Sequence, residues 1–431
     1  MEQLTMNYLQ DTAAMALEAM RAQGFEHAQV SAASTEQDEL NIAHNEPSLL
    51  RSTQTQKIAL RGLIDGRKAS TELSDFSPQA VRQRVASLFA DALGAPQDPA
   101  NAVSAGQQAR IVQGPQQADP SVLADKVAEL LAFRAAQTPL MMVDEGYAAH
   151  TLAHCQTLTT GGSDLRSSLG WYGLSAFGTA REGSQSSSFN YAGGSAHDLR
   201  TQSAENYFGI SDMLRDTTRQ IHTRGISGNF VGEVVLTPNA VTDLLEWLQG
   251  QLSDTQLISG SSLYRERVGE VIASPLLHLR SRFNAPGVAA LSADAFVTPA
   301  LDVLTAGRLM TLTPSLYASR KTGLTHVPVA GSGWEIAAGA TARADMVAAV
   351  RHGALVGRWS MGSPAPNGDF SGVIKNSFLI EEGVMGAALS EVMVSGNMAR
   401  MLLDVLAVSR ERIDTGDQAL PWLRIGNLNF S

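Results

Sequence analysis

Short apolar runs separated by Gly and Pro fill most of residues 228–431, and this pattern constrains the fold more than any other feature of the chain. The runs consist of Val, Ile, Leu and Phe, and their lengths are those of β-strands bounded by turn residues. Many short strands at this spacing are typical of a sandwich or a barrel. We therefore predict a large, mainly antiparallel, sandwich- or barrel-like β domain over residues 228–431.

The residues before this domain mix helical and strand patterns. Residues 4–23 place apolar side chains at helical spacing, and Gly24 ends that helix. The "DGR" stretch at 65–67 separates two alternating runs and predicts a hairpin. Ser77 is a suitable N-cap for a second helix that ends at Gly94.

Residues 95–120 are rich in Pro, Gln and Ala, and we interpret them as a surface connection. The predicted fold class is therefore α+β, with α+β segments preceding the β domain. We place the segments at 1–115, 116–227 and 228–431.

Composition limits the classes of function. The net charge of −10 lacks the basic field of a nonspecific nucleic-acid binder, so we predict no nucleic-acid partner. No run of apolar residues approaches the ~18 needed to cross a membrane. The first residues carry no signal-peptide pattern, and we expect a soluble cytoplasmic protein.

His150, His154 and Cys155 form the densest group of metal-ligand residue types. On a helix, two histidines four residues apart could hold one metal ion. The Thr- and Ala-rich surroundings instead predict a strand, on which the two histidines would lie roughly 13 Å apart. The role of the three residues stays open at this point.

The stretch "VVLTPNAVTDLLEWLQGQLSD" at 234–254 predicts a strand that runs into an amphipathic helix. Thr237 is a suitable N-cap and Pro238 a suitable first helical residue. A single apolar stripe follows at helical spacing. Its members are Val241, Leu244, Leu245, Leu248 and Leu252.

The last third of the chain carries the most specific motifs. "NGDFS" at 367–371 precedes "SFLIEEG" at 377–383, and "SEVMVSGN" at 390–397 follows. These motifs resemble the C-terminal segment of the TldD/TldE (PmbA) family. The matching residues are Gly368, Asp369, Phe370, Ser371, Phe378, Ile380, Glu381, Gly383, Glu391, Ser395, Gly396, Asn397 and Met401. The chain departs from the family pattern at Lys375 and Asn376, which stand in place of a Gly-rich pair.

The resemblance implies a specific question about the helix after Thr237. In TldD-type members this helix carries two zinc-binding histidines and a general-base Glu. Counted without a gap from the shared strand, Glu246 and Gln251 stand at the histidine positions and Trp247 at the Glu position. The resemblance therefore implies a TldE/PmbA-type subunit with no catalytic or metal-binding residue and no cofactor of its own, zinc being expected in a TldD-like partner.

The function implied is that of a non-catalytic subunit in a TldD/TldE-type zinc metalloprotease heterodimer. Such a pair would take unfolded or modified peptides into an internal cavity that this chain helps to shape. Asn367, Gly368, Asp369, Phe370 and Ser371 are the candidate substrate or interface residues, the alternative being a tight turn between two strands. Two other hypotheses remain: a metal-free homodimeric peptide-binding scaffold, and a fold-recruited enzyme of a peptide or natural-product pathway.

Overall fold

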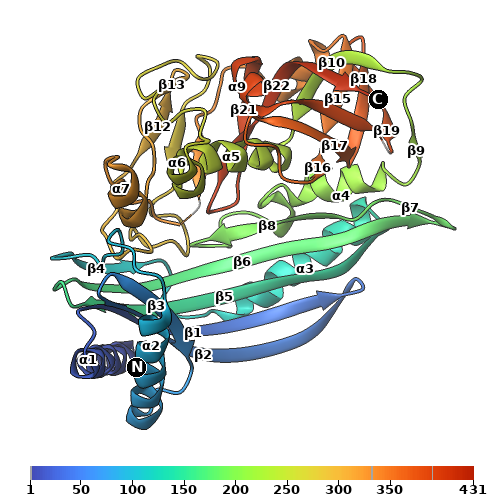
Figure 1. The fold of residues 1–431 in the computed structure, drawn as a ribbon. Coiled ribbons are helices and arrows are strands. Elements are labelled where there is room, and N and C mark those ends of the chain that lie inside the picture. The colour runs from blue at the N-terminus through green and yellow to red at the C-terminus, as the bar shows by residue number, and fades with distance from the viewer. Residues whose placement is uncertain (1, 332, 391) are drawn as a thin grey trace.

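The computed structural model describes residues 2–331, 333–390 and 392–431. Two β-sheets lie one above the other in Figure 1. The lower one is built from residues 27–196 and the upper one from residues 223–430. Glu391, one of the residues that match the family motif, lies outside the described part of the chain.

Eight of the described strands form the N-terminal sheet, in the order β3-β2-β1-β5-β6-β4, with β7 and β8 both paired to β6. The strands are β1 (His27–Ala43), β2 (Glu46–Ile64), β3 (Arg67–Leu73), β4 (Gln108–Gln113), β5 (Met141–Thr159), β6 (Asp164–Glu182), β7 (Gln185–Ser186) and β8 (Asn190–Ala196). The predicted hairpin is confirmed, because Asp65 and Gly66 form the turn between β2 and β3.

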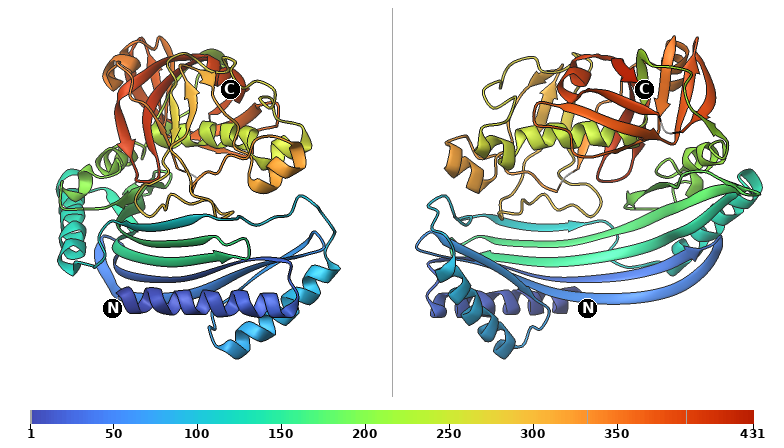
Figure 2. Two further views of the ribbon diagram at one scale, coloured as in Figure 1. Left: turned by 90° about the vertical axis from the view of Figure 1, so that its left-hand side faces the viewer. Right: turned by 45° about the vertical axis from the view of Figure 1, so that its right-hand side comes forward.

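The first two helices of this half lie on the side of the sheet away from the C-terminal domain, whereas the last one lies next to that domain (Figures 1 and 2). The helices of this half are α1 (Glu2–Gln23), α2 (Pro78–Gly94), α3 (Pro120–Gln137) and α4 (Ile210–Thr218), with a 3₁₀ turn at Ala204–Asn206. The predicted start of α2 is confirmed, since the Ser77 hydroxyl accepts a hydrogen bond from the Ala80 N–H at 3.3 Å. Leu9, Leu17 and Met20 of α1 are buried against β1 and β2.

The stretch 95–120 is more than the surface connection that its composition predicted. Its residues 108–113 form β4, which pairs in parallel with β6. The side chains of β4 alternate between exposed and half-buried, so the strand needs few large apolar residues. Strands from 1–115 and from 116–227 thus share one sheet, and the segments form a single layer.

The C-terminal sheet contains fourteen of the described strands and is mainly antiparallel, as predicted. Its longest strand, β22, pairs with β10, β14, β20 and β21. The strands are β9 (Thr223–Arg224), β10 (Phe230–Leu236), β11 (Leu279–Ser281), β12 (Asp302–Thr305), β13 (Arg308–Leu309), β14 (Trp334–Ile336), β15 (His352–Val356), β16 (Arg358–Met361), β17 (Asp369–Lys375), β18 (Ser377–Glu381), β19 (Val384–Leu389), β20 (Met393–Asn397), β21 (Val405–Asp414) and β22 (Ala419–Phe430).

The core of the C-terminal domain joins this sheet to one long helix. Val234 of β10, Leu248 of α5, Ile374 of β17 and Val394 of β20 are all fully buried in the same apolar cluster. The helices of this half are α5 (Pro238–Leu252), α6 (Asp254–Ser259), α7 (Leu316–Thr322), α8 (Arg343–Ala348) and α9 (Met398–Leu403). No helix in the described part of the chain is long and apolar enough to cross a membrane.

Candidate functional site

Helix α5 begins as the sequence predicted. The Thr237 hydroxyl accepts a hydrogen bond from the Ala240 N–H at 3.3 Å and donates one to the Gly357 carbonyl at 2.7 Å. The cap therefore also ties the helix to the end of β15. All five residues of the predicted apolar stripe are at most 3% exposed.

The three positions at which a zinc-binding helix would carry its chemistry have different environments. Trp247 is 8% exposed and Gln251 is 1% exposed, whereas Glu246 faces solvent. The Trp247 Nε1–H donates to the Ala365 carbonyl at 3.3 Å. The Gln251 Nε2–H donates to the Pro366 carbonyl at 2.9 Å. These side chains hold residues 362–368, the loop between β16 and β17, against the helix.

The second polar atom of the Gln251 amide is also occupied. Its Oε1 accepts from the Leu263 N–H at 2.8 Å, so this one side chain joins two loops to α5. A small cavity of about 350 Å³ remains beside the helix, lined by Asp243, Glu246 and residues 361–364 among others. Burial, reinforced by the negative charge of Glu246, raises the pKa of Asp243 to about 6.

The residues at this face do not fit a zinc ion. The Gln251 amide is engaged at both ends, and an indole N–H is a donor only. Two carboxylates are left, whereas catalytic zinc sites take three protein ligands. Within the described ranges, no group of three or more His, Cys, Asp or Glu side chains is placed to hold a metal ion.

The "NGDFS" stretch forms a hydrogen-bonded turn that leads into β17. The Asp369 carboxylate accepts from the Asn367 and Asn397 amides, each at 2.8 Å, and these bonds hold its pKa below the usual range, with Asn397 the larger cause. Gly368 has φ +93°, and a Cβ there would meet the Asn397 amide at 3.1 Å, so any other residue would be strained. Phe370 is buried against Trp359. These contacts show a hydrogen-bonded turn before β17, and a role of the stretch in binding substrate or a partner stays a prediction.

His150, His154 and Cys155 all lie on strand β5, which confirms the strand prediction. The His150 Nε2 is 2.9 Å from the Pro115 carbonyl, and its ring packs edge-on against Tyr172. His154 is buried in the same strand. Burial raises the pKa of the Cys155 thiol, which favours its neutral form.

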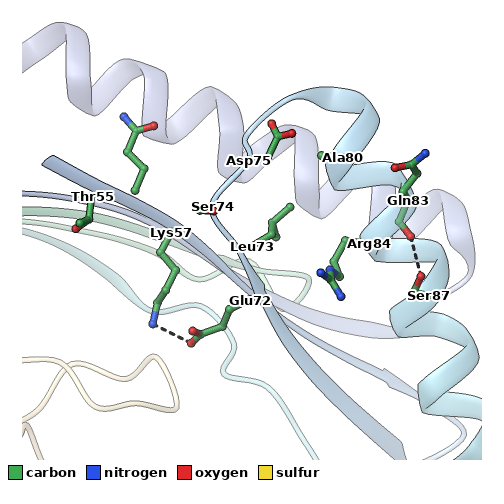
Figure 3. Close-up of a pocket in the computed structure, with 11 residues that line it drawn as sticks. Thr55, Lys57, Glu72, Leu73, Ser74, Asp75, Ala80, Gln83, Arg84 and Ser87 are labelled. Atoms are coloured by element: carbon green, nitrogen blue, oxygen red, sulfur yellow. Dashed lines mark hydrogen bonds and ion pairs between the residues drawn. The ribbon is translucent and has the colours of Figure 1, made fainter.

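A broad hollow of about 850 Å³ lies between β2, β3 and α2, in the N-terminal half of the molecule (Figure 3). Figure 3 shows its one ion pair between labelled side chains, Lys57 with Glu72, which are 2.9 Å apart and more than half exposed. The Asp75 carboxylate there accepts from the Ser77 N–H and holds the start of α2. The hollow thus offers solvated polar groups and no reactive pair.

A cavity that sequence reasoning missed lies between the two sheets. It has a volume of about 290 Å³ and is lined by β8, α4, the first turn of α5 and the turn between β21 and β22. Residues from seven separate segments meet there, so no local motif could have indicated it. Thr237, Pro238 and Asn376, which the sequence singled out for other reasons, line this cavity.

The C-terminal domain matches a known protein family. Residues 229–431 match the family model described as the PmbA/TldA metallopeptidase C-terminal domain. Residues 229–431 therefore belong to this family of C-terminal domains. The resemblance seen in the sequence is confirmed, and the family is metallopeptidase-like. No curated protein matches the chain.

Three solved structures share the family fold over nearly the whole chain. TldE from Thermococcus kodakarensis superposes with a TM-score of 0.81 at 16% identity, over 97% of this chain and 100% of that one. A protein described as a modulator of DNA gyrase from Bacteroides thetaiotaomicron gives 0.82 at 19% identity, over 98% of each chain. A Thermotoga maritima protein with a similar description gives 0.77 at 15% identity, over 98% and 100%. The predicted α+β fold is confirmed.

Proposed function

We propose that this chain is the non-catalytic, TldE/PmbA-type subunit of a cytoplasmic zinc metalloprotease that cleaves unfolded or modified peptides. The observation that carries the proposal is the face of α5 at which the resemblance puts a zinc site. Gln251 and Trp247 there bind the 362–368 loop through the Pro366 and Ala365 carbonyls. The helix keeps its cap and its buried stripe, while its polar face stabilises the subunit itself.

Zinc and the general base would then come from a TldD-like partner. The β1–β2 hairpin supports pairing with another subunit. Residues 46–55 of β2 are exposed, and β3 covers only Ile58–Ile64 on that edge. Leu49 and Leu50 are 50% and 66% exposed. A long strand edge with exposed leucines is a ready surface for another chain.

Co-expression with a TldD-like protein tests the proposal. We expect the two chains to copurify in equal amounts, zinc to follow the partner, and cleavage of an unfolded peptide to require both chains. Glu246→Ala in this chain should leave cleavage by the pair unchanged. Stoichiometric zinc in this chain alone, or peptidase activity of this chain alone that Glu246→Ala abolishes, would refute the proposal. A stable homodimer that ignores the partner would favour a peptide-binding scaffold instead.

A further inference from the structure

The cavity between the two sheets carries an inference about peptide binding. It opens to solvent beside Tyr191, which is 48% exposed, and Asp417, which is also exposed. Its inner wall is apolar and buried, with Met213, Leu355 and Trp422 among its members. The volume of about 290 Å³ lies at the small end of ligand sites, which suits one apolar side chain better than a cofactor.

A buried amide donor without a partner lines this cavity. Asn376 is 6% exposed, and its Oδ1 accepts from the Arg358 Nε–H at 2.8 Å. Its Nδ2 has no hydrogen-bond partner among the described residues. The backbone there is left-handed, with φ +50°, which Asn tolerates better than most side chains. A buried donor left unpaired is costly, so this group is suited to an acceptor oxygen supplied by a ligand.

The start of α5 adds a second attraction for an acceptor oxygen. Thr237, Pro238 and Asn239 line the cavity, and the N-terminal end of a helix is electropositive. Asp212 and Asp216 also line the cavity, together with Arg343. Arg343 is paired with Asp212, so the lining carries no surplus of positive charge for a carboxylate. The balance favours a neutral carbonyl, such as that of a peptide bond.

Strand β8 supplies a backbone edge at the same place. Among the described strands, it pairs with β6 alone. On its other side, the Ser195 N–H donates to the Thr415 carbonyl at 2.8 Å, so this edge already accepts one extended-chain contact. Alternate residues of a strand direct their backbone groups to the same side, and Gly193 therefore faces this edge as well. Gly193 and Tyr191 both line the cavity.

We propose that an extended peptide pairs with the open part of the β8 edge, at Gly193 and the Tyr191 carbonyl, places one apolar side chain in the cavity and gives a backbone carbonyl to Asn376 Nδ2. Strand addition would supply affinity, and the pocket would supply the preference for an apolar residue. The bound peptide is the substrate class of the proposed function, and the inference rests on that function. The site is separate from the α5 face where the resemblance puts zinc.

Fluorescence anisotropy with the full chain alone tests the site. The probe is a fluorescein-labelled eight-residue peptide of Ser, Thr and Gln with one central Leu. We expect saturable binding, weakened about tenfold or more when the Leu is replaced by Ser, because an apolar contact is lost. Two further peptides carry N-methyl groups on the odd-numbered or on the even-numbered amides. We expect one of them to lose binding and the other to keep it, since a peptide strand pairs through one edge.

Asn376→Asp tests the donor, because it keeps the acceptor that Arg358 uses and removes the free N–H. We expect about tenfold weaker binding, and the melting temperature is measured alongside to show that the variant is folded. The proposal is overturned if the Leu and Ser peptides bind equally, if the two N-methylated peptides bind equally, or if no peptide binds saturably. Copurification with the TldD-like partner is measured separately, so a chain that pairs normally but binds no peptide would refute this site without refuting the proposed function.

Discussion

Replacement of Gln251 by Ala tests whether the polar face of α5 has become structural. The side chain is 1% exposed and makes two hydrogen bonds, at 2.9 Å to the Pro366 carbonyl and at 2.8 Å from the Leu263 N–H. Loss of both bonds costs about 2 kcal/mol, at roughly 1 kcal/mol each. Removal of the buried methylene and amide atoms adds about 1 kcal/mol. We expect Gln251→Ala to lower the free energy of unfolding by about 3 kcal/mol.

Pro366 and Leu263, whose backbone groups lose their partner, are both exposed, so water can replace the lost hydrogen bonds and limits the cost. The assay is urea unfolding followed by circular dichroism, with hydrogen exchange measured at residues 362–368. Gln249→Ala on the same helix is the matched control and should change stability by less than about 0.5 kcal/mol. A Gln251→Ala variant as stable as the control, with unchanged exchange in the loop, would refute the reasoning.

Three further predictions follow from single side chains. Burial and the charge of Glu246 raise the pKa of Asp243 to about 6. Ionised Asp243 therefore lowers the free energy of unfolding above that pH, and this loss of stability disappears as the pH falls and the carboxyl is protonated. Asp243→Asn should raise the melting temperature at pH 8 and not at pH 4; equal shifts at both would contradict this. Asn397 caps α9 by accepting from the Arg400 N–H at 3.1 Å, and its amide also donates to Asp369. Asn397→Ala should therefore lower the free energy of unfolding, measured in urea, by about 2 kcal/mol. Asn397→Ser keeps the cap and should lose about half as much stability. Cys155 is the chain's one thiol and its pKa is raised by burial, so it should react with a disulfide reagent far more slowly in the native protein than in urea; equal rates would show that the thiol is accessible.

Local patterns predicted those elements that local interactions determine. The cap at Thr237 and the apolar stripe of α5 could be predicted because both depend on residues within one short stretch of sequence. The Asp65–Gly66 hairpin could be predicted for the same reason. Local patterns do not decide every boundary: α9 ends at Leu403, and Val405–Asp414 is a strand because β22 pairs with it. A pairing partner in another part of the sequence decided that choice.

The sequence by itself determined that Gln251, Trp247 and Glu246 offer no zinc-ligand set, since residue type alone decides which atoms can bind a metal. Only the tertiary structure decided what these residues do instead, because their partners at Pro366 and Ala365 lie more than a hundred residues away. The same holds for the cavity between the sheets. Asn376, Gly193 and Thr237 share it through the packing of two sheets, and no sequence spacing encodes that meeting.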